Sequence, residues 1–298
     1  MAIGDFKLAK TDIGYVGEGL SRPECIIAER DGTLWVSDDR GGATRIGRDG
    51  RQRTIGTIPG LPNGLALDAD GSLLVAEIDH GKFYRLQRDG RQQLLADHAG
   101  GKPLGSLNFV YRDPAGRIWL TISTHTVPRR DAIDKSIPDG AILRYDDGKL
   151  QVAAEGIYFA NEVRVDRAGR YLYAAESGKG RVRRMPIAAD GSLGTGETYG
   201  PEQLFPRAIV DGIAFDAEGN LWVTEVSRNG LYVITPAGQC HCVFEDPAGE
   251  TLQFPASITF GGADLRTAYI GSIRMNRLGV FRSPVAGEPL AHWHDRVA

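Results

Sequence analysis

Six oxygen-bearing side chains recur along the chain at intervals of 39 to 53 residues, each near the start of a similar stretch of sequence. Carboxylate and amide oxygens are the ligands that hard divalent cations such as Ca²⁺, Mg²⁺ and Mn²⁺ prefer. Two carboxylates held close together also repel each other unless a cation or a proton intervenes. If the fold brings these side chains together, they can form a cation site. They are Glu24, Asn63, Asn108, Asn161, Asp211 and Ser257.

The stretches around these residues share one plan: a short alternating apolar run, a turn of the D-x-x-G type and a second apolar run. Alternation with a period of two on both sides of a turn is typical of a β-hairpin with one buried face. Gly supplies 39 of 298 residues, about twice its usual share of ~7%, as many tight turns require. The units begin at Pro23, Pro62, Leu107, Ala160, Val210 and Ala256.

Further strand-like segments lie between these hairpins, and a unit of ~40–50 residues with four short strands is the size of a propeller blade. We therefore predict an all-β protein: one six-bladed β-propeller domain over residues 1–298, with four-stranded blades around a central channel. Residues 5–16 are expected to complete the last blade and close the ring. Two packed β-sandwiches are the alternative, which the equal phasing of the units disfavours. The additional segments are 82–87, 140–147, 181–187, 230–236 and 278–284.

The innermost strand of each propeller blade runs along the central channel, so equivalent positions of six blades converge on one axis. The six oxygen-bearing residues should therefore surround one mouth of the channel. For Asn63 and Ser257, hydrogen bonding to channel water is the simpler role. For Glu24 and Asp211, mutual repulsion favours a bound cation.

Charge and composition exclude several classes of protein. With 35 Lys and Arg against 38 Asp and Glu, the formal charge is −3, which argues against nucleic-acid binding. No apolar segment approaches the ~18 residues that a membrane span needs, and the N-terminus lacks a signal-peptide core. Three cysteines do not make a disulfide framework. We expect a cytoplasmic monomer or small homo-oligomer that binds neither nucleic acid nor membrane.

The ordered set of motifs resembles the family of senescence marker protein, gluconolactonase and luciferin-regenerating enzyme, which also includes a calcium-dependent diisopropyl fluorophosphatase. The most specific matches are VDGIAFDAEGNLWVTE from Val210 and the FGGADL turn at 260–265. The resemblance implies a propeller with one catalytic divalent metal at the channel mouth, Ca²⁺ before Zn²⁺, Mn²⁺ or Mg²⁺. The ligands it implies are Glu24, Asn108, Asn161 and Asp211, and Glu18 in the run G-E-G-L competes with Glu24 for the first position.

The chain departs from lactonases of sugar acids in the third unit, where Ser106 and Phe109 stand in place of the usual Arg and Asp. A sugar-acid lactone is therefore a poorer match than a less polar one. Our hypothesis is metal-dependent hydrolysis of a small lactone or related cyclic ester, in which the metal polarises the carbonyl for attack by water. Asp211 resembles the family's proposed base. The alternatives are metal-dependent phosphotriester hydrolysis and a non-catalytic ligand-binding propeller with a structural ion.

Other residues are weaker candidates for the site. His125 lies in the longest insertion, 123–140, and is a candidate general acid or base, or a substrate donor; that insertion is otherwise an ordinary surface loop with one possible helical turn at 128–138. Cys240, His241 and Cys242 lack the second ligand pair that zinc needs, so we expect buried strand cysteines. The candidates for substrate binding are Asn63, Phe109, Arg40 and His125.

Overall fold

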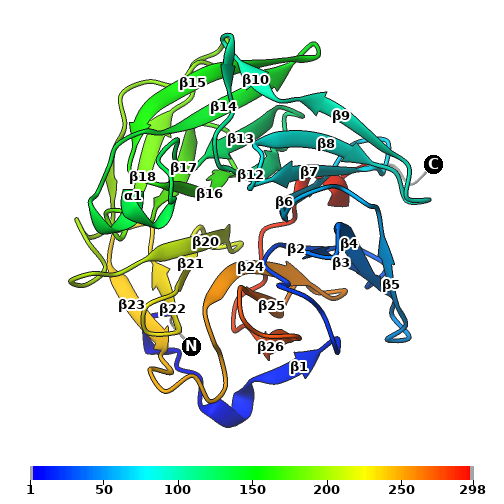
Figure 1. Ribbon diagram of the computed structural model, residues 1–298. Coiled ribbons are helices and arrows are strands. Elements are labelled where there is room, and N and C mark those ends of the chain that lie inside the picture. The colour runs from blue at the N-terminus through cyan, green and yellow to red at the C-terminus, as the bar shows by residue number, and fades with distance from the viewer. Residues whose placement is uncertain (1–2, 296–298) are drawn as a thin grey trace.

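The strands of the computed structural model, which describes residues 3–295, form six four-stranded antiparallel sheets around a central axis (Figure 1). This confirms the predicted six-bladed β-propeller. One end strand of each sheet lies nearest the axis, and these inner strands contact those of the neighbouring blades. Equivalent residues of different blades therefore face a common channel.

The sheets follow one another in chain order around the ring. The first consists of β2 (Ile26–Ala28), β3 (Leu34–Asp38), β4 (Gly42–Ile46) and β5 (Gln52–Ile55), and the second of β6 (Pro62–Leu67), β7 (Leu73–Glu77), β8 (Lys82–Leu86) and β9 (Gln92–Ala96). The third consists of β12 (Leu107–Arg112), β13 (Ile118–Ile122), β14 (Gly140–Asp146) and β15 (Lys149–Ile157). The fourth consists of β16 (Ala160–Val165), β17 (Tyr171–Glu176), β18 (Arg181–Pro186) and β19 (Glu197–Tyr199).

The last two sheets complete the ring. The fifth consists of β20 (Val210–Phe215), β21 (Leu221–Glu225), β22 (Gly230–Ile234) and β23 (Cys240–Phe244). The sixth takes β24 (Pro255–Gly261), β25 (Thr267–Ser272) and β26 (Leu278–Arg282) from the C-terminal part of the chain and β1 (Gly14–Val16) from the N-terminal part. Because β1 pairs with β26, this blade ties the two ends of the chain together.

A small hairpin and short helices lie outside the blades. The hairpin pairs β10 (His98–Ala99) with β11 (Lys102–Pro103). The helices are α1 (Arg130–Asp134) and the 3₁₀ turns η1 (Ile3–Asp5), η2 (Lys10–Asp12) and η3 (Ala291–Trp293). Among the described residues, no helix is long and apolar enough to cross a membrane.

The repeated D-x-x-G turns also position the tryptophans that fill the blades. Asp113 and Asp216 are fully buried, and each accepts a hydrogen bond at 3.0 Å from the indole of a Trp six residues later, Trp119 or Trp222. These carboxylates also accept backbone N–H groups of their own turns. The same side chain therefore closes the turn and satisfies the one polar atom of a buried indole.

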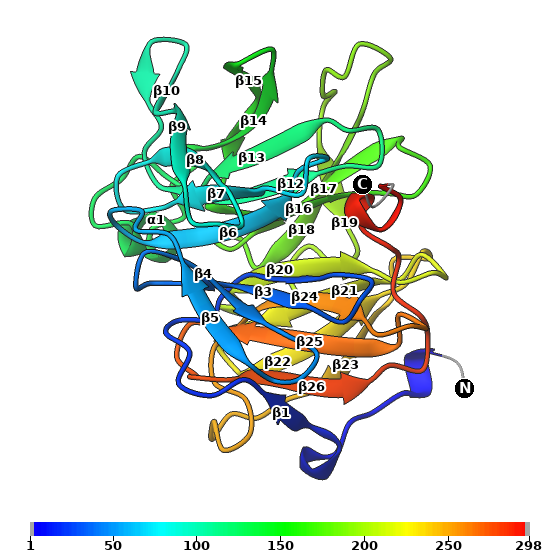
Figure 2. The same cartoon turned by 90° about the vertical axis from the view of Figure 1, so that its right-hand side faces the viewer.

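The two ends of the channel lie on opposite faces of the molecule. The helix α1 stands on the face where the inner strands begin, and the described C-terminal residues lie on the other face (Figure 2). We call the first face the entry mouth and the second the far mouth.

Candidate metal centre

The side chains that the repeat singled out lie at the entry mouth and are all buried. In five blades the pairing of the inner strand is interrupted by a β-bulge at or beside the residue concerned. A bulge bends the strand and changes the direction of a side chain. Asn108, Asn161 and Asp211 each lie within such an interruption. In these blades the side chains of the mouth therefore come from positions where the regular pairing of the inner strand with the second strand is interrupted.

A left-handed turn precedes each inner strand. In two blades the turn residue is a glycine, and in the other four it is a larger residue, which adopts this conformation only at an energetic cost. The residues and their φ angles are Arg22 (48°), Gly60 (92°), Gly105 (61°), Phe159 (58°), Arg207 (66°) and Phe254 (48°).

Buried glutamates at the ends of the second strands hold these entry loops. Glu77 accepts a hydrogen bond from the backbone N–H of Leu61 at 2.9 Å, and Glu225 accepts one from Ile209 at 2.8 Å. Both glutamates also bind the turn that follows their own strand. They therefore fix the loops that deliver Asn63 and Asp211. Sequence analysis missed this role, although an acid closes the units at Asp38, Glu77, Glu176 and Glu225.

One half of the mouth is a connected network of hydrogen bonds. The Asn63 amide donates to Glu24 Oε1 at 2.8 Å and to Asn108 Oδ1 at 3.2 Å, so three blades meet there. The Arg22 guanidinium lies 2.5 Å from Glu24 Oε2 and donates to Asn63 Oδ1 at 2.6 Å. Sequence analysis missed Arg22, whose only signal is its place two residues before Glu24.

The other half of the mouth presents oxygens without partners. The Asn161 amide donates to Ser177 Oγ at 3.3 Å, and Ser177 in turn donates to the Val210 carbonyl at 2.6 Å. Because the Asn161 NH₂ group points to Ser177, Asn161 Oδ1 points away from Ser177. Within the described residues, Asn161 Oδ1 and Asp211 Oδ1 are buried and make no hydrogen bond. Such atoms are costly to bury unless something else binds them.

The electrostatics of the mouth favour a positive charge. Burial, followed by repulsion from Glu24 and Glu162, raises the pKa of Asp211 well above its usual range. Arg22 opposes this rise. A buried acid that is destabilised by two neighbouring acids is relieved by a bound cation or a proton.

The donor set at the mouth fits a hard divalent cation. Two carboxylates and two amide oxygens come from four blades. In the described part of the chain, Glu24 Oε2, Asn161 Oδ1 and Asp211 Oδ1 are buried without a hydrogen bond, and only Glu24 Oε2 has an ion-pair partner, Arg22. Across residues 3–295, no group of three or more His, Cys, Asp or Glu side chains is arranged to hold a metal. A cation at the mouth would therefore depend on the amide oxygens of Asn108 and Asn161.

Several other predicted residues lie elsewhere. Glu18 is exposed and its backbone pairs with Gln52, whereas Glu24 is 5% exposed and lies in the mouth. Arg40 extends into solvent and pairs with Asp38 at 2.6 Å. Phe109 is 3% exposed, and the Arg164 guanidinium lies over its ring at 5.0 Å from the centroid.

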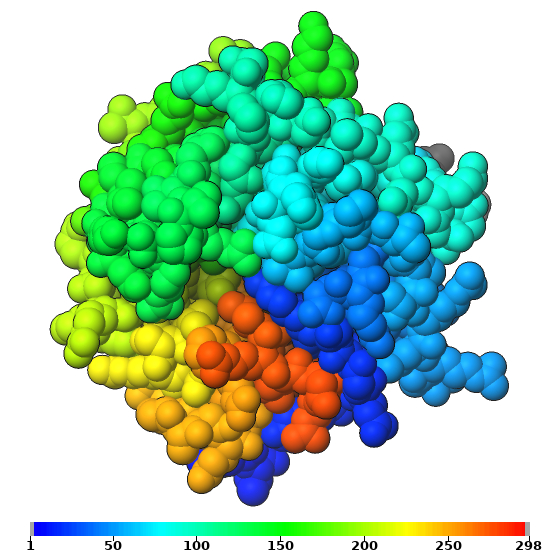
Figure 3. All heavy atoms as spheres, in the orientation of Figure 1, coloured from blue at the N-terminus to red at the C-terminus, as the bar shows by residue number. Residues whose placement is uncertain are grey.

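His125 lies on the loop of the third blade that contains α1. Its side chain is exposed, and the loop is held by Asp139, which accepts hydrogen bonds from Thr124 and Thr126. His125 and Asp139 line a hollow of about 780 Å³ together with Lys102 and Glu155. On this face, loops of several blades meet around the centre of the ring (Figure 3).

We expected Cys240 and Cys242 of the fifth blade to be buried, and the structure shows them only partly buried. Cys240 and Cys242 do lie in a strand, but both are partly exposed because β23 is the outermost strand of its sheet. Cys25, by contrast, is buried below the mouth, where its sulfur accepts the Leu65 N–H at 3.2 Å. Burial raises the pKa of the Cys25 thiol, which makes it a packing residue rather than a nucleophile.

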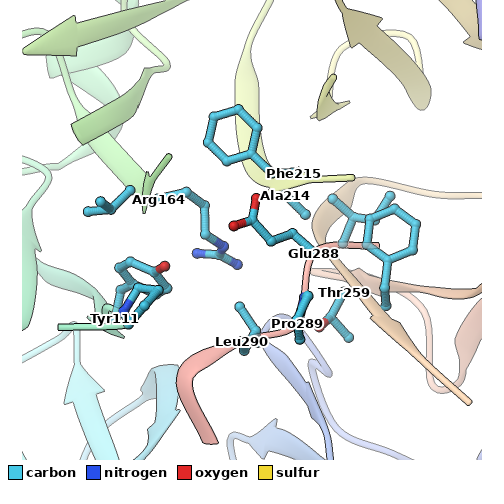
Figure 4. A pocket seen from close by; sticks show the side chains of 12 residues that line it. Tyr111, Arg164, Ala214, Phe215, Thr259, Glu288, Pro289 and Leu290 are labelled. Carbon is cyan, nitrogen blue, oxygen red and sulfur yellow. The ribbon is translucent and has the colours of Figure 1, made fainter. Parts of the chain in front are cut away.

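A second charged cluster lies inside the channel toward the far mouth. Glu162 and Arg164 form a buried ion pair at 2.9 Å. The side chains of Arg164 and Glu288 point toward one another across a small pocket that is also lined by Tyr111 (Figure 4). The C-terminal segment 284–295 covers this end of the channel.

The comparisons with known proteins agree with this architecture. Residues 22–274 match the family described as the SMP-30/gluconolactonase/LRE-like region, and the chain belongs to that family. A curated relative, the 6-deoxy-6-sulfogluconolactonase of Pseudomonas putida, is 28% identical over 277 residues, covering 91% of this chain and 87% of that protein.

Solved structures share the fold at lower identity. A gluconolactonase from Xanthomonas campestris has a TM-score of 0.74 at 22% identity, covering 91% of this chain and 89% of that one. A calcium-binding regucalcin from Agrobacterium tumefaciens has a TM-score of 0.72 at 18% identity, covering 94% and 98%. At these identities the likeness shows the propeller fold.

Proposed function

We propose that this protein is a divalent-metal-dependent hydrolase of a small lactone. The observation that supports this most is the convergence of Glu24, Asn108, Asn161 and Asp211 at one mouth, with two buried oxygens left unpartnered. Family membership and the sulfogluconolactonase relative support a lactone as the substrate. The calcium-binding regucalcin makes Ca²⁺ the first ion to test.

In this proposal the four side chains hold one cation, which supplies Lewis acidity to the substrate carbonyl. The chain's own residues perform the remaining tasks. Asn63, through its bonds to Glu24 and Asn108, keeps both in place. The C-terminal segment crosses the far mouth, so in this proposal the substrate approaches through the entry mouth.

Asp211 is the candidate general base. Its carboxylate is buried at the mouth, and its Oδ1 makes no hydrogen bond to the described residues, so this oxygen is free to accept a proton from water. Its carboxylate would take a proton from water as the water oxygen bonds to the lactone carbonyl carbon. The ring C–O bond then breaks, and the leaving oxygen takes up a proton to give the hydroxy acid.

The test is a pH-indicator assay on chelator-treated protein restored with Ca²⁺, Mn²⁺, Mg²⁺ or Zn²⁺. The panel contains aliphatic, aromatic and sugar lactones, a sulfonated sugar lactone and a phosphotriester. We expect lactone turnover that disappears on chelation and returns with one ion. Turnover of the phosphotriester alone would instead support a phosphotriester hydrolase. If no compound is hydrolysed but metal raises the melting temperature, the result would support a non-catalytic binding protein with a structural ion.

Asp211→Ala and Asn161→Ala should each reduce kcat/KM by at least about 10²-fold, because each removes an oxygen that acts at the reacting carbonyl or on its cation. Asp264→Ala is the matched control, since that exposed carboxylate pairs with Arg282 at 2.7 Å away from the mouth. Full activity in folded Asp211→Ala protein would refute the proposed site.

A further inference from the structure

Arg22 places a positive charge within the candidate metal centre. Its side chain is only 17% exposed, and its guanidinium contacts two of the six mouth residues, Glu24 and Asn63. The residue sits in the left-handed turn that leads into the first inner strand, with φ at 48°. The backbone therefore holds this arginine at the mouth.

The contact occupies an atom that a cation would need. Glu24 Oε1 accepts a hydrogen bond from Asn63, and Glu24 Oε2, which makes no hydrogen bond within residues 3–295, lies in an ion pair with the Arg22 guanidinium. A divalent ion that binds Glu24 must replace the guanidinium or lie beside it. Two positive charges at hydrogen-bonding distance from one carboxylate repel each other strongly in a buried site.

Among the described residues, Glu24 is the only carboxylate within ion-pair distance of the Arg22 guanidinium. Glu162, another buried acid near Asp211, is already paired with Arg164 at 2.9 Å. Arg22 therefore serves as the counter-ion of Glu24 and, at longer range, of Asp211. Without a metal it makes the close approach of these two carboxylates tolerable.

We propose that Arg22 is a positioning residue that sets the metal affinity of the mouth, because a divalent cation must displace its guanidinium from Glu24. This inference rests on the proposed function, since it assumes that the mouth binds a metal. The inference implies that Arg22 occupies different positions in the metal-free and the metal-bound protein. The metal affinity then depends on the competition between the divalent ion and the Arg22 guanidinium for Glu24.

Isothermal titration with Ca²⁺ or Mn²⁺ alone, on the chelator-treated full chain and without substrate, tests the proposal. Arg22→Met keeps the length of the side chain and removes its charge, so it should bind the ion at least about tenfold more tightly. Arg22→Lys restores the charge and should stay close to the unchanged protein. Arg282→Met removes an exposed arginine from a surface ion pair and should have no effect.

Melting temperatures give a second readout. Without metal, Arg22→Met should melt below the unchanged protein, since Glu24 loses its partner. With saturating metal, the difference in melting temperature between the two proteins should shrink or change sign, because the variant binds the ion more tightly and tighter binding stabilises the native state more. A merely structural role for Arg22 would lower both values equally.

Equal or weaker metal binding by folded Arg22→Met would overturn the inference while leaving the metal site intact. Absence of binding in both the unchanged protein and Arg22→Met would overturn the inference and the proposed metal site together. The two failures are therefore distinguishable in one titration series.

Discussion

Arg164 carries a buried positive charge inside the channel, and its partner Glu162 directly follows the expected ligand Asn161. Arg164 is 6% exposed, and its guanidinium lies over the rings of both Phe109 and Tyr111, at 5.0 and 5.2 Å from their centroids. Burial raises the pKa of Glu162, and Arg164 opposes that rise. Glu162 also acts on the proposed metal centre, since its charge helps to raise the pKa of Asp211.

We expect Arg164→Met to lower the free energy of unfolding by about 3–5 kcal/mol, because it leaves a carboxylate buried without its partner. The double variant Glu162→Gln with Arg164→Met should recover most of this loss, since neither member of the pair is then charged. Gln can still accept the Ile213 N–H that Glu162 accepts at 3.2 Å. Urea unfolding of the three proteins measures both differences.

Equal destabilisation in the single and double variants would contradict this account. The loss would then come from the packing of Arg164 on the two aromatic rings rather than from an uncompensated charge. Glu162→Gln alone completes the cycle and separates the pairwise interaction from the individual effects.

At the scale of the strands, some features were predictable from sequence and others were not. The hairpins were predictable because an Asp of each D-x-x-G turn and the alternating apolar residues act locally, as Asp216 does on Trp222. The convergence of six polar positions followed from the symmetry of the repeat. The helical turn expected within 128–138 is α1.

The bulges and the counter-ion were not predictable in this way. A bulge at Asn161 depends on how β16 pairs with β17, which the local pattern does not encode. The position of Arg22 depends on a left-handed turn formed by a residue that rarely adopts one. Both features depend on strand pairing and backbone conformation in the folded blade, which the apolar pattern of a repeat unit does not specify.

Close packing between inner strands gives the next prediction. A Cβ added to Gly212 would lie 2.5 Å from the Ser257 Cα and 2.5 Å from the Ala256 carbonyl oxygen, both backbone atoms of β24. Gly212→Ala should therefore force β20 and β24 apart beside Asp211. We expect a loss of about 1–3 kcal/mol in unfolding free energy and weaker metal binding.

Urea unfolding and metal titration of Gly212→Ala check this expectation. Gly14→Ala in β1 is the control, because its added Cβ would meet the nearest atom, Val280 Cγ1, at an ordinary 3.5 Å. Unchanged stability and metal affinity in Gly212→Ala would mean that the spacing of the inner strands does not shape the mouth.

At the scale of the whole molecule, the two ends of the chain close the ring in different ways. β1 completes the sixth sheet by pairing with β26. The C-terminal segment crosses the far mouth: the Glu288 N–H donates to the Phe215 carbonyl at 2.9 Å, and the Trp293 indole donates to the Ala28 carbonyl at 2.8 Å. It thereby connects the fifth blade to the first.

Glu288 makes this connection sensitive to pH. Burial, with smaller contributions from Asp166 and Asp216 and an opposing one from Arg167, raises the pKa of Glu288 to about 7. An acid whose pKa is higher in the folded state than in the unfolded state loses stability as the pH rises between the two values. Glu288 should therefore weaken the fold progressively from about pH 4.5 to pH 7.

Glu288→Gln should remove this effect, because the amide does not ionise. We expect the variant to be more stable than the unchanged protein by about 1–2 kcal/mol at pH 8, a figure reduced for partial solvent screening. The difference should vanish near pH 5, where the folded protein keeps Glu288 protonated. Urea unfolding across this range measures it, with the exposed Glu218→Gln as control. If the difference in unfolding free energy does not change with pH, the amide acts through packing at the far mouth, and the charge of Glu288 does not destabilise the contacts of the C-terminal segment.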